Sequence, residues 1–86
     1  MAKPVAEGDR LLTPAERMSV VAEANYQIEP LLYAMRRLAE EESDHLRFYC
    51  IAVLPRLQQL NHAAQSASCD ECYLSELAGY DVPIAD

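Results

Sequence analysis

The amino-acid sequence predicts an all-α fold: an antiparallel helical hairpin with a short third helix, which pairs with a second copy into a four-helix type of homodimer. Two long segments repeat apolar residues at alternating steps of three and four, the spacing of one helix face. Each segment follows residues that can cap a helix. The second segment also carries more apolar residues than a single packed face needs.

Size and charge limit the classes of function. The chain has 86 residues, 51% of them hydrophobic and 24% charged, which is the composition of one small globular domain. Its formal charge is −7, so a large phosphate-binding surface is excluded and direct binding of nucleic acid is not expected. No apolar run approaches the roughly 20 residues that span a bilayer, and the start lacks the apolar core of a secretory signal. We therefore expect a cytoplasmic protein without membrane contact.

The first helix has the most specific start signal in the chain. Residues 1–12 lack periodicity and are expected to form a flexible N-terminal arm. Thr13 can cap the free amides, Pro14 suits the first helical position and Glu16 completes a capping box. The apolar stripe that follows comprises Met18, Val21, Asn25, Ile28, Leu32, Met35 and Ala39, with Ala24, Leu31 and Leu38 beside it.

A second helix with the same spacing is expected to start after a cap at Ser43 or Asp44. Its stripe comprises Leu46, Cys50, Val53, Leu57, Leu60, Ala64 and Ala67. The two stripes are expected to form the seam of the hairpin. Pro30 and Pro55 then lie at one level, where they either kink the two helices or break them into four shorter ones.

The C-terminal third shows a second capping pattern and an acidic excess. Ser68-Cys69-Asp70-Glu71 precedes a short third helix that stops at Gly79, so residues 13–79 form the folded unit and residues 80–86 an acidic tail. No Lys or Arg follows Arg56. An acidic docking patch for a basic protein surface is predicted from this imbalance, formed by Asp70, Glu71, Glu76 and Asp81.

The second helix is expected to carry an interface. Residues 45–67 contain only two charged residues, Arg47 and Arg56, and a hairpin has only one inner face. A further apolar side therefore has to meet another element. We expect the partner or dimer interface at Phe48, Ile51, Ala52 and Pro55. The alternative is a compact three-helix monomer.

Only one spacing has a known chemical meaning. Cys69-x-x-Cys72 at a helix start suits thiol chemistry, or metal binding if His62 adds a ligand. Asp70 and Glu71 between the thiols oppose a thiolate, and two small apolar side chains packed in a core explain the pair more simply. Neither a metal nor a cofactor is therefore expected.

The sequence thus indicates a small acidic protein that is not an enzyme. We expect a regulator, inhibitor or adaptor that binds a larger protein with a basic surface. The alternative is a thiol or metal-binding module centred on Cys69 and Cys72.

Overall fold

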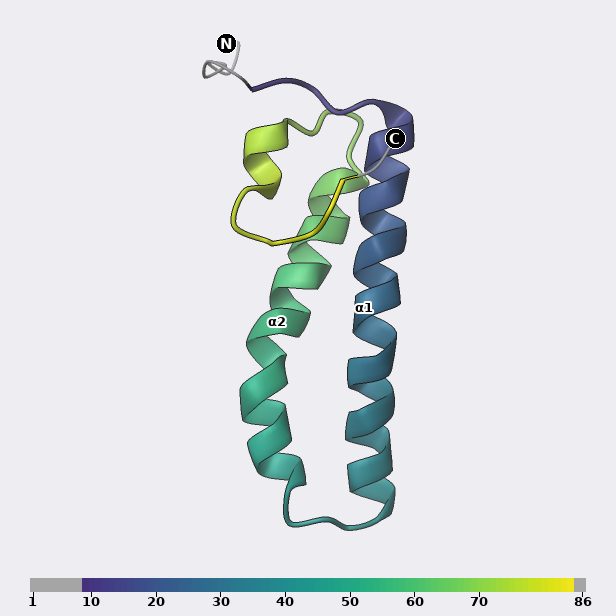
Figure 1. The fold of residues 1–86 in the computed structure, drawn as a ribbon, viewed down its shortest axis with the longest axis vertical. Helices are drawn as coiled ribbons and strands as arrows, with labels where there is room; N and C mark the ends of the chain where they lie inside the picture. Colours follow the sequence, from purple (N-terminus) through teal and green to yellow (C-terminus); the bar gives the residue numbers. More distant parts are fainter. Residues whose placement is uncertain (1–8, 85–86) are drawn as a thin grey trace.

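The chain folds into a long helical hairpin, and residues 9 and 84 lie at the same end of it (Figure 1). The computed structural model describes residues 9–84, so most of the expected arm and the last two residues of the expected tail lie outside the described range. Helix α1 (Pro14–Glu40) packs antiparallel to helix α2 (Leu46–Ala67), and a short 3-10 helix, η1 (Leu74–Leu77), follows. The predicted all-α hairpin is confirmed.

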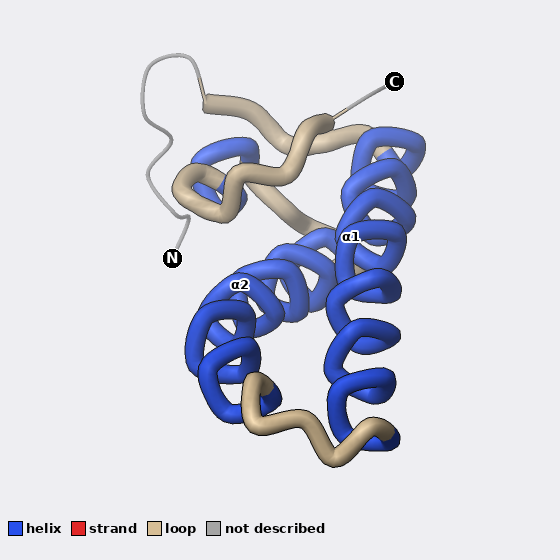
Figure 2. The backbone as a smooth tube through the Cα atoms, turned by 60° about the horizontal axis from the view of Figure 1, so that its bottom comes forward, coloured by secondary structure: helices blue, strands red, loops and turns tan. Residues whose placement is uncertain are grey.

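The molecule is a rod rather than a sphere. Its principal extents are 51 × 21 × 19 Å. Its radius of gyration is 15.8 Å, against about 12 Å for a compact domain of this length. Figure 2 shows why the molecule is elongated. Within residues 9–84, the other non-helical segments lie at one end of the hairpin and the interhelical connection lies at the opposite end.

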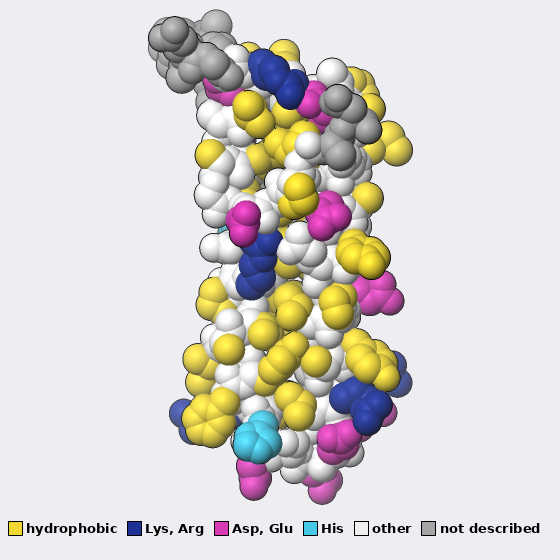
Figure 3. All heavy atoms as spheres, in the orientation of Figure 1, with side chains coloured by type: hydrophobic (Ala, Val, Ile, Leu, Met, Phe, Trp, Pro, Cys, Tyr) yellow, Lys and Arg dark blue, Asp and Glu magenta, His cyan; other side chains and the backbone are white. Residues whose placement is uncertain are grey.

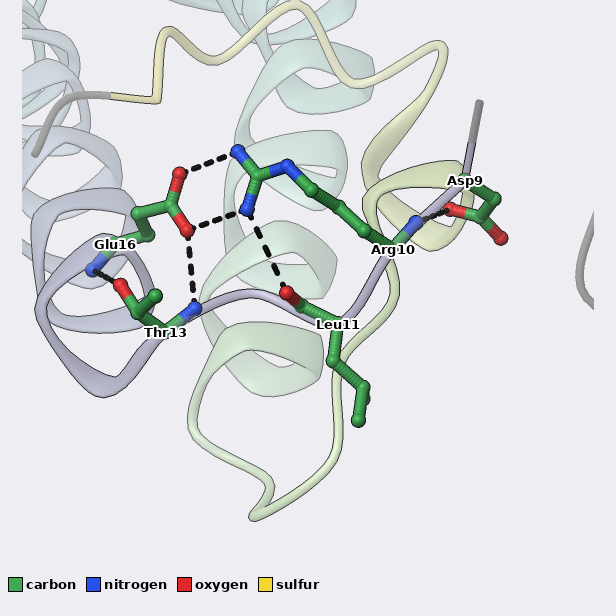
Figure 4. Close-up of polar contacts among 5 residues, drawn as sticks. All are labelled: Asp9, Arg10, Leu11, Thr13 and Glu16. Atoms are coloured by element: carbon green, nitrogen blue, oxygen red, sulfur yellow. Dashed lines mark hydrogen bonds and ion pairs between the residues drawn. The ribbon is translucent and has the colours of Figure 1, made fainter. Parts of the chain in front are cut away.

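The start of α1 forms the predicted capping box. The Glu16 amide donates to Thr13 Oγ1 at 3.1 Å, and the Thr13 amide donates to Glu16 Oε1 at 3.0 Å. The Arg10 guanidinium adds two bonds of 2.7 and 2.6 Å to the same carboxylate (Figure 4). These bonds from Arg10 and Thr13 outweigh the burial of Glu16 and lower its pKa to about 2.

Residues 9–12 were expected to belong to the flexible arm, but they pair with the C-terminal segment. The Leu12 amide donates to the Cys72 carbonyl at 2.8 Å. The Asp9 carboxylate accepts from the Ser75 amide at 2.8 Å and from its hydroxyl at 2.6 Å. Two segments more than sixty residues apart in sequence therefore close one end of the molecule.

The buried core lies entirely at this end. Arg56 helps to hold the C-terminal segment there, because it donates to Gln27 Oε1 at 2.8 Å and to the carbonyls of Tyr80 and Asp81. In contrast, no residue between 28 and 57 is buried. The buried hydrophobic residues are Leu12, Val20, Ala24, Leu60, Ala63, Ala67, Cys72, Leu77 and Val82.

Of the predicted α2 seam, Leu60 and Ala67 are buried and the other residues are half-buried, whereas the α1 stripe is rotated away from the core. Met18 is 73% exposed and Leu32 51%, whereas Val20 and Ala24 are completely buried. Asn25, which was expected within the seam, is also exposed. The reason is that α1 has a single helical neighbour, so only the arc that faces α2 and the C-terminal segment is covered. One side of the predicted stripe stays in contact with solvent.

Neither proline breaks its helix. α1 continues through Pro30 and α2 through Pro55, so the alternative of four short helices is wrong. Both prolines are exposed. Water can therefore satisfy the carbonyl that loses its amide partner in the preceding turn.

The connection between the helices differs from the predicted cap. His45 precedes α2 and makes no capping bond with its side chain. Ser43 Oγ instead accepts the His45 amide at 3.1 Å, while Glu42 takes a left-handed conformation with φ of 52°. This backbone reversal closes the loop without Ser43 or Asp44 at the N-cap position.

The third helix is shorter and begins later than predicted. Ser68 ends α2 instead of capping a new helix, and only Leu74–Leu77 form the 3-10 turn. The pairing of Leu12 with Cys72 is the reason, since it holds the chain before η1 extended. Gly79 follows the turn with φ of 91°, where glycine is favoured.

Candidate functional site

The distal half of the hairpin, defined as residues 28–57, exposes large apolar side chains. Figure 3 shows them gathered along both helices in the lower part of the molecule. The exposed fractions range from 46% to 70% for Leu32, Tyr33, Phe48, Ile51 and Leu54. A surface of this kind is typical of protein contacts.

The residues predicted as the partner or dimer interface belong to this half. Phe48 is 70% exposed and Ile51 61%, and both Ala52 and Pro55 are exposed. Phe48 also borders an open groove between the helices near the interhelical loop. The groove is lined by Tyr33, Ala34, Arg37, Leu38, Glu41, His45, Phe48 and Tyr49.

Charge is balanced within the distal half. It contains five acids and four arginines, so its net charge is −1. Several of these groups pair along the surface of α1: Arg37 contacts Glu41 at 3.0 Å, and Arg36 contacts Glu40 at 3.6 Å. Such exposed pairs contribute little to stability. Because their opposite charges cancel, the electrostatic field around the apolar surface is weak.

The negative charge concentrates at the core end. Residues 58–84 contain four acids and no Lys or Arg. Asp70, Glu71 and Asp81 are exposed, as an acidic docking patch requires. Glu76 differs, because it is half-buried and its carboxylate accepts the Tyr73 amide at 2.6 Å. Glu76 therefore has a local structural role at the start of η1.

The two cysteines of the Cys-x-x-Cys spacing have different surroundings. Cys72 is completely buried in the core, whereas Cys69 is exposed, and neither forms a disulfide. The exposed His62 makes an edge contact with the Tyr80 ring, with 6.4 Å between ring centroids. Within residues 9–84, no three His, Cys, Asp or Glu side chains are grouped to hold a metal ion.

Three exposed residues of the distal half were not among the predicted site residues. Leu32 was assigned to the hairpin seam, and Tyr33 and Leu54 were not assigned to an interface. The signal that could have identified them is the length of the hairpin. The C-terminal third is too short to cover two helices of 27 and 22 residues along their whole length.

Comparisons with protein families, with curated proteins and with solved structures found no match to this chain. Within residues 9–84, neither helix contains an apolar stretch long enough to cross a membrane.

Proposed function

We propose that this chain is a non-enzymatic interaction protein that binds a larger protein through the distal half of its hairpin. The observation that carries the proposal is the division of the molecule into a buried core end and a distal half without buried residues. Amphipathic helices in proteins gain most of their stability from the packing of their apolar face. A bound protein supplies that packing here.

Phe48 and Ile51 are the proposed anchors of this contact. Both are large, apolar and more than half exposed, and interface energy concentrates in such residues once water is removed from them. Ala52 and Pro55 add a flat apolar margin on the same helix. Asp70, Glu71 and Asp81 are proposed to face a basic surface of the bound protein, where they raise the rate of encounter. A regulator, inhibitor or adaptor fits this arrangement, as does a homodimer.

Site-specific cross-linking tests the proposal. A photo-reactive amino acid replaces Ile51 in one variant and Gln65 in a control, and each is irradiated in its native host. Gln65 is exposed on the same helix, two heptads closer to the core end, so it reports nonspecific encounters. We expect a discrete adduct with one host protein from position 51 only. Equal adducts from both positions, or none, would refute the proposed contact.

The acidic residues are tested on the captured protein. Replacing Asp70 by Asn and Glu71 by Gln should slow association and flatten its dependence on ionic strength, because exposed charges act mainly on encounter. Circular dichroism should show unchanged folding, since both side chains are exposed. Association rates that are insensitive to these changes and to salt would remove the acidic patch from the proposal.

A further inference from the structure

One long face of the hairpin is only partly covered and carries two stripes of uncharged residues, with the charged Arg17, Glu29 and Arg36 at its border. On α1 it consists of Met18, Val21, Asn25, Ile28 and Leu32, which follow steps of three and four. On α2 the same steps connect Leu54, Leu57, Asn61, Ala64 and Ser68. These residues are called the open face, and each is exposed or half-buried.

The two stripes lie on the same side of the hairpin. Met18, Val21 and Asn25 line a shallow groove together with Ala67 and Ser68 at the end of α2. Because residues at steps of three and four share one helix face, the rest of the α2 stripe lies on that side too.

The C-terminal segment covers the opposite side. There, Arg56 connects Gln27 with the backbone of residues 80 and 81, and the segment crosses α2 in the foreground of Figure 1. Phe48 belongs to that side as well, because it lines the groove near the loop together with Ala34, which lies one heptad after Gln27 on α1. The open face and the proposed anchor Phe48 are therefore separate surfaces.

We propose that a second copy of this chain covers the open face, so that two hairpins form an antiparallel four-helix bundle. This inference deepens the proposed function by naming one partner of the hairpin. Steps of three and four on two antiparallel helices are the pattern of half such a bundle. The open face covers 15 residues of each helix, so it is about 22 Å long and about 20 Å wide, or about 440 Å² before side-chain relief. That footprint is about half of the roughly 800 Å² that each partner buries in a stable interface, so we expect a weak dimer.

The two asparagines of the open face point to self-association. Asn25 lies 15 residues before the end of α1, and Asn61 lies 15 residues after the start of α2, so both are about 22 Å from the loop end. Apolar residues flank each amide on both sides. A two-fold axis at this level brings the amides of two copies together, and such a polar layer sets the register of helical bundles.

Charge favours the antiparallel arrangement. A parallel dimer places two core ends side by side, and each carries four acids within residues 58–84. In the antiparallel dimer these ends lie at opposite ends, far beyond the screening length of about 8 Å.

Sedimentation equilibrium of the full chain tests the partner and the face. We expect a dimer at 10⁻⁵ to 10⁻⁴ M, roughly the range of a modest interface. Leu32→Glu and Leu54→Glu should each raise the dissociation constant at least about tenfold, because the new charge is buried without a partner. Phe48→Glu is the matched control and should leave the dimer intact. All three positions are at least 46% exposed, so circular dichroism should show folded chains.

Distances between spin labels test the orientation. A label at Ser43→Cys, with Cys50 and Cys69 changed to Ala and Cys72 left buried, reports the separation of the two loop ends. The antiparallel bundle predicts about 45 Å, and a parallel dimer less than about 25 Å. A short distance would overturn the antiparallel arrangement. A wild-type monomer at 10⁻⁴ M, or a dimer that only the Phe48 variant dissociates, would overturn the open-face contact. Cross-linking of a host protein at position 51 is independent of these results.

Discussion

Two identical substitutions in α2 test the uneven distribution of the core. Leu60 is completely buried, whereas Leu54, six residues earlier in the same helix, is 46% exposed. Both change to Ala, so helix propensity and the number of atoms removed are the same in the two variants. A difference in unfolding free energy therefore reports the difference in burial.

The expected magnitudes follow from these exposures. Leu60→Ala should cost about 3 kcal/mol, because it removes a buried side chain and leaves a cavity among Val20, Ala24 and Ala63. Leu54→Ala should cost about 1 kcal/mol in a single chain, since about half of its side chain already contacts water. For a domain whose total stability is about 4–13 kcal/mol, the first change removes a large fraction and the second a small one.

Urea denaturation followed by circular dichroism measures both values. The experiment requires a concentration at which sedimentation shows single chains, because a dimer adds a stabilising term that depends on concentration. Repeating it at higher concentration should increase the cost of Leu54→Ala while that of Leu60→Ala changes less. Equal costs in the single chain would refute the reasoning, since the distal half would then have a core of its own.

Four further outcomes follow from the local geometry. Glu16→Gln should weaken the dependence of the unfolding free energy on pH in the acid range. The pKa of Glu16 is about 2 in the folded chain against 4.5 ordinarily, so its stabilisation is present above pH 4.5 and is lost as the pH falls towards 2. A wild-type acid transition identical to that of the variant would contradict this. Thr13→Ala should cost about 1 kcal/mol in urea denaturation by loss of the cap, and a cost near zero would argue against it. Gly79→Ala should cost about 1 kcal/mol through backbone strain alone, because no atom lies within 4 Å of the added carbon; an unchanged midpoint would show that the residue can avoid positive φ. Hydrogen exchange should protect amides near Val20 and Leu60 most and those near Tyr49 least, and uniform protection of both helices in single chains would be inconsistent with a core at one end.

The local structure of α1 could be predicted from the sequence because short-range interactions decide it. Thr13, Pro14 and Glu16 are within three residues of one another, so their capping geometry depends on little else. The same holds for the helical character of both long segments, whose apolar spacing requires a packed face. The exposed apolar side of α2 at Phe48 and Ile51 also followed from the shortage of charge in residues 45–67.

Tertiary structure decided which side of each helix is covered. The pattern from Met18 to Ala39 specifies a stripe, but only the positions of α2 and the C-terminal segment determine that Val20 and Ala24 are buried while Leu32 is not. The pairing of Leu12 with Cys72 joins residues 60 positions apart, and no local sequence pattern predicts it. This pairing, with the Leu74 amide bond to the Arg10 carbonyl, shortened the third helix, because backbone groups held in an extended pairing are unavailable to a helix. Together with the bonds between Asp9 and Ser75 and those from Arg56 to residues 80 and 81, it holds the C-terminal segment at the core end.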